Sequence, residues 1–386
     1  MPARDAVIVG AVRSPVGVGK PEKGLLSGIH PVDLSALVLQ GLVARTGVDP
    51  ALVDDVIWGC VSQIGEQSFN VARSSALAAG FPESVTGVTI DRQCGSSQQA
   101  VHFAAAGVIA GHYDVVIAGG VETMSRVPMF SNAVGGDGPF GSMMKARYQD
   151  RLVGQGTSAE MVAQQWNLDR TALDSLAVES QRRAAAATVA GLFVDEIIPI
   201  TTKAGAVATD QGIRADTTLE RLASLRTPFM ANGVVTAGNA SQVSDGSAAL
   251  LITTSETATR LGLTPLARFH TAAMAGVDPI IMLTGPIPAT AKALKRSGLS
   301  IGDIGTFEVN EAFASVVGAW LKETGADPAL TNPNGGAIAL GHPLGGSGAR
   351  LMTTMVHHMR RNDIRFGLQT MCEGGGMANA TILELL

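Results

Sequence analysis

A cysteine stands where an apolar strand gives way to a helix. The apolar run 85–90 ends shortly before Cys94, small residues surround the thiol, and a helix-forming run, 97–109, follows it. A thiol at the N-terminus of a helix lies at the positive end of the helix dipole, which favours the thiolate and lowers the thiol pKa. Cys94 is therefore a candidate nucleophile, and a small buried core cysteine is the alternative interpretation.

A histidine near the other end of the chain occupies a comparable place. His342 lies in a glycine-dense turn before another helix-forming run, and Pro343 fixes the turn. An imidazole beside a thiol can act as its base, so Cys94 and His342 would form a nucleophile and base pair if the fold brings them together. Cys60, by contrast, lies in a continuous apolar strand and is expected in the core.

Two further polar segments follow expected strands. Cys372 ends an apolar run, and the glycines 374–376 that follow offer backbone N–H groups able to stabilise an oxyanion. Asn310 comes directly after the strand expected at 306–309 and places an amide side chain at its end. Neither segment is decisive alone, because asparagine after a strand commonly serves as a turn or cap residue.

The elements around these residues alternate between short aliphatic strands and alanine-rich helices. The order begins with a strand at 6–9, a helix at 34–44 and a strand at 56–58. Such alternation predicts an α/β fold with a mostly parallel sheet that helices cover on both faces.

Spacing along the chain supports a duplicated unit. Cys94 follows Asp55 by as many residues as His342 follows Asp303. After each comes a small-residue helix and then a strand that ends in glycines. Two related halves that face each other across a pseudo-twofold axis would bring Cys94 and His342 to their interface.

The segment between the halves, roughly 121–246, has a different composition. It is rich in Met, Gly, Pro and Phe at 123–143, and it then carries a long helix expected to begin at an Asp169 N-cap and run toward Ala187. An insertion above the strand ends of an α/β sheet is where a lid over a substrate would sit, and an oligomerisation loop is the alternative.

Length and composition limit the class of protein. The chain has 386 residues, which at about 150 residues per domain suits two large domains or a large one with an insertion. Its 46% hydrophobic and 16% charged residues exclude intrinsic disorder, and its 46 glycines indicate close backbone packing. A net charge of −5 without a basic tract argues against nucleic acid as a partner.

Cysteine usage and hydropathy bear on the compartment. Three cysteines without metal-ligand spacing favour a reducing compartment and predict no metal site. No apolar run reaches the roughly 18 residues of a membrane span, and the N-terminus has the pattern of a strand rather than of a signal peptide. We therefore expect a cytoplasmic protein without membrane insertion.

Four blocks of this sequence resemble the active-site blocks of the thiolase family in residue type and order, over nearly the whole chain. The resemblance implies two similar βαβαβαββ halves, packed as a layered α/β/α/β/α core, with a loop domain inserted in the first half. The blocks are the Cys94 segment, Asn310–Phe313, Gly341–Pro343 and Cys372–Gly376. The implied division is 1–120 with 247–265 for the N-terminal half, 121–246 for the inserted loop domain and 266–386 for the C-terminal half.

The resemblance implies a role for each active-site residue. Cys94 would take the acyl group as a thioester after His342 removes its proton, and Cys372 would act as acid and base at the substrate α-carbon. One oxyanion hole would be formed by His342 and a water held by Asn310, and the other by the backbone N–H groups of Cys94 and Gly374.

Coenzyme A is the implied substrate, with no permanently bound cofactor. The family pattern puts Ser241 near the pantetheine, Ala312 and Phe313 beside it, and Arg214 near the adenine. An exposed loop charge is the alternative for Arg214.

One departure from the family pattern concerns the acyl chain. Short-chain members often carry His-Met where this chain has Gly154 and Gln155, which favours an acyl group longer or bulkier than acetoacetyl. Met282 is expected to line the same pocket. The implied function is a degradative thiolase of lipid β-oxidation, acting on a fatty acid or a steroid side chain by ping-pong acyl transfer, as a homodimer or homotetramer.

Three other functions are consistent with parts of the sequence. A biosynthetic acetoacetyl-CoA thiolase runs the same chemistry in reverse. A decarboxylating condensing enzyme would carry a second histidine, or a histidine and an asparagine, in place of Cys372. A non-catalytic acyl-CoA-binding scaffold would be expected to lose Cys94, His342 or Cys372, and all three are present.

Overall fold

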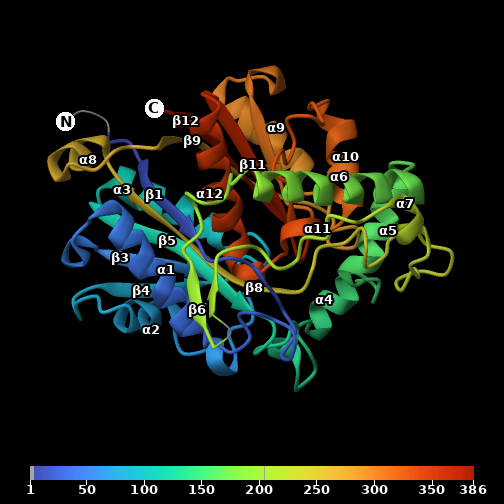
Figure 1. Cartoon of the computed structure of the whole chain (residues 1–386). Coiled ribbons are helices and arrows are strands. Elements are labelled where there is room, and N and C mark those ends of the chain that lie inside the picture. Colours follow the sequence, from blue (N-terminus) through green and yellow to red (C-terminus); the bar gives the residue numbers. More distant parts are fainter. Residues whose placement is uncertain (1–3, 204) are drawn as a thin grey trace.

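Two units with similar orders of elements build the molecule (Figure 1). The computed structural model describes residues 4–203 and 205–386. The N-terminal unit consists of β1 (Val7–Arg13), β2 (Gly17–Val18), α1 (Pro31–Thr46), β3 (Asp55–Gly59), α2 (Val71–Ala78), β4 (Thr86–Ile90), α3 (Ser96–Ala110), β5 (Val115–Thr123), β8 (Ser244–Thr253) and α8 (Ser255–Leu261). The C-terminal unit consists of β9 (Ala267–Gly276), α9 (Pro286–Ser297), β10 (Thr306–Val309), α10 (Ala314–Thr324), α11 (Ala337–Leu340), α12 (Leu344–Arg361), β11 (Phe366–Glu373) and β12 (Met377–Leu385).

The units stack in five layers, α/β/α/β/α. The strands follow the order β4-β3-β5-β8-β1-β9-β12-β11-β10, with β2 beside β8. The sheet passes from one unit to the other through a short pairing of β1 with β9, Val7 with Arg268 and Ile8 with Ala267. Helices α1 and α2 pack on one outer face, α9 and α10 pack on the other, and α3 and α12 pack against each other between the units. This layered, duplicated α/β fold is the one that the sequence predicted.

Both faces of the central strands, such as β5 and β8, are buried, which explains their continuous run of small and aliphatic residues. In β5, Val115 and Ile117 belong to the hydrophobic cluster beneath α1, whereas Val116 and Ala118 belong to the cluster around α3 and α12. Successive side chains of a strand point to opposite faces, so a strand between two helical layers needs apolar residues at every position.

The two central helices approach each other closely, and glycine permits this approach. A Cβ on Gly348 of α12 would lie 2.3 Å from the backbone nitrogen of Gln98 in α3. Any side chain there would push the helices apart. The contact therefore fixes the distance between the N-terminal ends of α3 and α12, where Cys94 and His342 lie.

The sheet is mixed rather than mostly parallel, which corrects the sequence prediction. Parallel pairing is confined to β3 with β4 and β5, and to β10 with β11. The strands β5 and β8 pair antiparallel, as do β11 and β12. The reason for the β11–β12 pair is local: Gly375 and Gly376 have φ of 82° and 80°, a tight-turn conformation that returns the chain directly beside β11.

The spacing argument for the duplication also needs a correction. Asp55 begins β3, whereas Asp303 ends a short 3-10 helix, Ile301–Asp303, that comes before β10. The equal separations to Cys94 and His342 therefore did not compare equivalent positions. The duplication itself is present, because the neighbouring strands β3-β5-β8-β1 of one unit correspond to β10-β11-β12-β9 of the other, although the second unit has no strand in the place of β4.

The inserted segment leaves β5 at Thr123 and returns at Ser244. The predicted long helix is present, and the side chain of Asp169 caps it by accepting a hydrogen bond from the Ala172 backbone N–H at 2.8 Å. The elements of the insertion are α4 (Ser142–Arg147), α5 (Gln155–Gln165), α6 (Arg170–Val189), β6 (Ile200–Thr202), β7 (Gly205–Val207) and α7 (Leu219–Ala223). In the part of the chain that the structure describes, no helix is long and apolar enough to cross a membrane.

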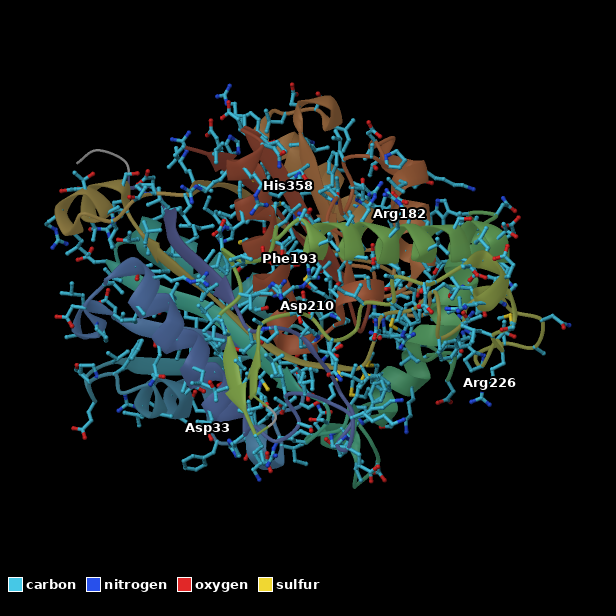
Figure 2. The ribbon with its side chains drawn as sticks, viewed as in Figure 1. Asp33, Arg182, Phe193, Asp210, Arg226 and His358 are labelled. Atoms are coloured by element: carbon cyan, nitrogen blue, oxygen red, sulfur yellow. The ribbon has the colours of Figure 1, made fainter. Side chains whose placement is uncertain are left out.

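A buried charge cluster ties the insertion to the end of β1. Arg13 is fully buried and pairs with Glu196 at 2.6 Å and with Asp210 at 2.7 Å. Its guanidinium lies 5.1 Å from the centroid of the Phe193 ring. Figure 2 shows Phe193 and Asp210 near the middle of the molecule. Because a buried guanidinium that loses a partner is strongly destabilising, this cluster holds the inserted segment in one position.

Candidate active site

Cys94 lies in the turn between β4 and α3, as predicted, and it is buried, with 3% of its surface exposed. The turn is held by the Ser96 hydroxyl, which accepts from the Arg92 backbone N–H at 2.8 Å and donates to the Gln93 carbonyl at 2.6 Å. Gln93 adopts a positive φ of 49°, which reverses the chain just before the thiol. The strand-to-helix turn thus aims one sulfur atom into the space between the two units.

The pKa of Cys94 differs from the sequence prediction. Burial raises the pKa of this thiol to about 12, and the nearby Glu373 adds to the rise. The Cys94 backbone and the Gln155 side chain act in the opposite direction and lower the pKa, but less than burial raises it. Desolvation therefore outweighs the helix terminus, and in the free protein Cys94 is a neutral thiol that needs a base.

His342 lies just before α12, and one of its ring nitrogens is available to act as a base. Its Nδ1 is 2.6 Å from the Ser347 hydroxyl, which itself donates to the Pro343 carbonyl at 2.8 Å. The Ser347 proton is thus already used, so the Nδ1 position carries the imidazole proton and leaves Nε2 as an acceptor. Burial, with a smaller contribution from Arg350, lowers the pKa of His342 to about 3, so the ring is neutral at physiological pH.

Asn310 meets His342 at the end of β10. Its Nδ2 lies 3.3 Å from the Nε2 atom of His342, and its backbone N–H donates to the Thr370 carbonyl of β11 at 3.1 Å. The Oδ1 atom of Asn310 is buried without a protein partner. An unpartnered buried acceptor of this kind is suited to holding a water molecule.

Cys372 lies in β11, with 1% of its surface exposed, in the hydrophobic cluster that also contains Met282, Ala312 and Phe313. Burial raises its pKa well above the ordinary value, and the interaction with the ionised form of Cys94 is the next cause of the rise. The two sulfur atoms, 278 positions apart in the chain, are therefore electrostatic neighbours in the fold.

Gly374 follows Cys372 and lies against the Cys94 turn. A Cβ on Gly374 would be 3.1 Å from Oε1 of Gln93 and 3.4 Å from Nε2 of Gln155. The absence of a side chain therefore leaves room between β11 and the turn that carries the nucleophile.

A cavity of about 250 Å³ is lined by His342, whereas Cys94, Cys372 and Asn310 are not among its lining residues. Its walls are mainly apolar, with a few polar groups, as is usual for a small-molecule site. Among its lining residues are five predicted positions, Gln155, Ser241, Ala312, Phe313 and His342. Its lining also includes three large apolar side chains that the sequence analysis did not single out, Met124, Met129 and Phe229.

The loop that carries Ser241 is fastened to the loop after β10. The Ser241 backbone N–H donates to the Ala312 carbonyl at 2.9 Å, and Ala240 forms an antiparallel bridge with Phe313. Three predicted contacts for coenzyme A thus form one wall. Arg214 is exposed and does not line this cavity, and its backbone N–H donates to Oε1 of Gln181.

Two residues near the site were missed by the sequence analysis. Ser347 sets the tautomer of His342. The sequence feature that could have identified it is a hydroxyl in the first turn of the helix that follows the histidine. Glu373 is fully buried, and neither of its carboxylate oxygens has a protein partner. Glu373 could have been identified in the sequence as a charged residue at the end of an apolar strand.

We predict a pH-dependent effect for Glu373→Gln. Burial raises the pKa of Glu373 from 4.5 to about 8, although Arg92 acts to lower it. Between these values the unfolded chain loses this proton while the folded chain keeps it, so wild-type stability falls as pH rises, by about 1 kcal/mol per pH unit. Glutamine cannot ionise, so the variant should match wild type near pH 4.5 and be a few kcal/mol more stable near pH 8.

Urea unfolding at a series of pH values measures this difference. Because Glu308 is buried with a similarly raised pKa and is common to both proteins, subtracting the two curves isolates Glu373. A stability difference that stays constant from pH 4.5 to 8 would contradict the assignment.

Comparison with known proteins finds similar sequences and structures along the whole chain. A family model described as the thiolase N-terminal domain matches residues 6–256, and one described as the thiolase C-terminal domain matches residues 263–385. A steroid 3-ketoacyl-CoA thiolase of Mycobacterium tuberculosis is 50% identical over 390 residues, which is 99% of this chain and 94% of that protein. The beta-ketoadipyl-CoA thiolase of Escherichia coli is 45% identical over 401 residues, which is 99% of each chain. The crystal structure of an acetyl-CoA acetyltransferase from Bacillus anthracis has a TM-score of 0.91 and 40% identity, covering 100% of this chain and 99% of that one.

Proposed function

Because this chain belongs to the thiolase family, we propose that it cleaves 3-oxoacyl-CoA with CoA into acetyl-CoA and a shortened acyl-CoA. The observation that carries the proposal is the meeting of two buried thiols, Cys94 and Cys372, beside an apolar cavity that a neutral imidazole lines. Thiol chemistry of this kind forms and breaks carbon–carbon bonds without a metal or a redox cofactor, and coenzyme A takes part only as substrate.

The first half-reaction forms the acyl-enzyme. The Nε2 atom of His342 takes the proton of Cys94, and the thiolate attacks the 3-oxo carbon of the substrate. The bond between C2 and C3 then breaks, the acyl group stays on Cys94 as a thioester, and the electron pair leaves as the enolate of acetyl-CoA. Cys372 donates its proton to C2 of that enolate. Acetyl-CoA departs and Cys372 is left as a thiolate.

The second half-reaction releases the product. The Cys372 thiolate takes the proton of an incoming CoA thiol, and the CoA sulfur attacks the thioester on Cys94. The shortened acyl-CoA leaves, and the Cys94 thiolate recovers its proton from His342. The Cys94 and Gly374 N–H groups donate to the thioester oxyanion, and His342 with a water on Asn310 donates to the enolate oxygen.

We assign the cavity to the substrate, with the inserted loop domain, 121–246, as its cover. Ser241, Ala312 and Phe313 contact the pantetheine arm, which their position along one wall supports. Arg214 remains a proposed contact of the adenine, for which its exposed position at the rim of the insertion leaves room.

The acyl chain is longer or bulkier than acetoacetyl. Met124, Met129 and Phe229 give the cavity an apolar wall, and each methylene buried there is worth about 0.8 kcal/mol, or about fourfold in binding. Relatives named for steroid and beta-ketoadipyl substrates indicate that this part of the family accepts varied acyl groups.

A thiolysis assay across 3-oxoacyl-CoA substrates of increasing length, with one polycyclic substrate, tests the acyl preference. We expect kcat/KM to rise with each added methylene and to be at least about tenfold lower for acetoacetyl-CoA than for the best substrate. A maximum at acetoacetyl-CoA would overturn this preference and favour the biosynthetic alternative.

The chain is further proposed to act as a homodimer, or as a tetramer built from dimers, in the cytoplasm. Strand β4 is the edge of the sheet, and its exposed Val88 would be covered if the β4 strands of two copies paired antiparallel. Three free cysteines suit a reducing compartment.

A further inference from the structure

We propose that Gln98 and Gln369 are positioning residues, whose buried, hydrogen-bonded amides hold the three elements that carry the catalytic side chains at fixed separations. Helix α3 follows Cys94, helix α12 follows His342, and strand β11 contains Cys372. The inference rests on the proposed function, because it takes these three side chains as the nucleophile, its base and the acid. Neither glutamine lines the substrate cavity.

The side chain of Gln369 connects β11 to both helices. Its Nε2 atom donates to Oε1 of Gln98 in α3 at 2.9 Å and to the Gly348 carbonyl in α12 at 2.8 Å. Both of these bonds go to oxygen atoms, so only the nitrogen of the Gln369 amide suits this place. One side chain of the strand therefore fixes where α3 and α12 lie relative to β11.

The side chain of Gln98 returns two hydrogen bonds to the sheet. Its Nε2 atom donates to the Thr381 hydroxyl of β12 at 2.7 Å and to the Gln369 backbone carbonyl at 3.3 Å. Gln369 and Thr381 are direct partners across the β11–β12 ladder, so their side chains point to the same face of the sheet. The two amides thus use all their N–H donors on α12, α3 and these two strands.

Burial turns these hydrogen bonds into a constraint on geometry. Both glutamine side chains are fully buried. A buried amide without a partner is costly, so the packing that satisfies both amides is favoured over packings in which one element has shifted. Apolar side chains at the same positions would fill the space without this directionality, because hydrophobic contacts do not depend on orientation.

A second hydrogen bond and a close approach act on the same two helices. The Ala349 backbone N–H of α12 donates to the Ser97 hydroxyl of α3 at 2.9 Å. The glycine at position 348 allows the approach, because a Cβ there would lie 2.3 Å from the Gln98 backbone nitrogen. The contact between α3 and α12 is therefore both tight and polar.

These links lie close to the catalytic side chains. Gln98 is in the first turn of α3, just after Cys94. Gly348 is next to Ser347, whose hydroxyl lies 2.6 Å from Nδ1 of His342. A shift of α12 against α3 would change the separation of the nucleophile from its base, and a misplacement of about 1 Å can cost about 100-fold in rate.

The test combines steady-state thiolysis and urea unfolding of single and double variants. The variants are Gln98→Met, Gln369→Met and the protein with both substitutions, which keep the side-chain length and lose the hydrogen bonds. Gln99→Met is the matched control, because Gln99 is the next residue of α3, is also buried, and has an amide oxygen without a partner. The amount of Cys94 thioester formed with 3-oxoacyl-CoA counts the competent sites, so that kcat refers to folded protein.

Each single variant should unfold at a lower urea concentration than wild type, because one amide is left buried without its partner. The double variant should regain most of this loss, since two apolar side chains then face each other and Thr381 keeps its contact with His102. Its kcat should nevertheless stay at least about tenfold below wild type, with an unchanged KM for CoA, because the cavity wall is untouched. Gln99→Met should keep the wild-type kcat.

A kcat of the double variant less than about tenfold below wild type would overturn the inference, because a purely structural role predicts that activity recovers together with stability. A loss confined to KM would overturn it as well. If circular dichroism finds one of the variants unfolded, the folded ones decide by their kcat and KM.

Wild-type protein separates this inference from the proposed function. Absence of a Cys94 thioester on wild-type protein incubated with 3-oxoacyl-CoA would overturn the function. A normal thioester on wild type, together with a wild-type kcat in the double variant, would overturn only the positioning role of Gln98 and Gln369.

Discussion

Replacing Cys94 by serine abolishes the acyl-enzyme and lowers kcat/KM for thiolysis by at least about 10⁴-fold, the loss typical of a removed nucleophile. The hydroxyl is far less acidic than a thiol, and the neutral His342, whose pKa burial lowers to about 3, is too weak a base to remove its proton. Spectrophotometric thiolysis with saturating CoA measures the effect.

Cys60→Ser is the matched control for this substitution. Cys60 is also buried, but it belongs to the hydrophobic cluster under α1 and α2 and does not line the cavity. Its variant should keep kcat/KM within a few-fold of wild type. Thiolysis by Cys94→Ser at the wild-type rate would refute the assignment of the nucleophile.

Replacing Cys372 by alanine separates acyl transfer to Cys94 from cleavage of the carbon–carbon bond. The variant should still accept an acyl group from acyl-CoA, because Cys94 and the hydrogen-bonded His342 remain and CoA can leave as a thiolate without a positioned acid. Cleavage of 3-oxoacyl-CoA should fall by at least about 10³-fold, because the enolate of acetyl-CoA then has no positioned acid to protonate it. Exchange of the acyl group between enzyme and labelled CoA is compared with thiolysis in the same preparation.

Cys94→Ser is the reference for this second experiment, since it should lose both reactions. If Cys372→Ala lost acyl exchange as well as thiolysis, the substitution would have disrupted the site as a whole. Full thiolysis by Cys372→Ala would show that Cys372 is not the acid and base.

The placement of the catalytic residues could be predicted because it depends on local sequence. A strand, a small-residue turn and a helix put Cys94 at a helix N-terminus wherever the unit packs. The same logic held for His342 before α12 and for Asn310 after β10. Asn310 and His342 meet at 3.3 Å in the structure, and the duplication predicts that Cys94 faces them across the interface of the two units.

Properties that depend on burial could not be predicted in this way. The dipole argument gave Cys94 a lowered pKa, but the three-dimensional fold removes water and brings Glu373 close, and both raise it. The antiparallel partners of β5 and β11 were missed because the direction of a buried strand is set by the connection that follows it, not by its apolar residues. Neither the pKa of a buried thiol nor the direction of a buried strand can be predicted from one short segment of sequence.

The most direct test of the account is the mass of the protein after incubation with 3-oxoacyl-CoA in the absence of free CoA. The account predicts one acyl group for each chain, located on the peptide that contains Cys94 and removed when CoA is added. An acyl group on Cys372 or Cys60, or rapid thiolysis by a protein that never carries an acyl group, would contradict it.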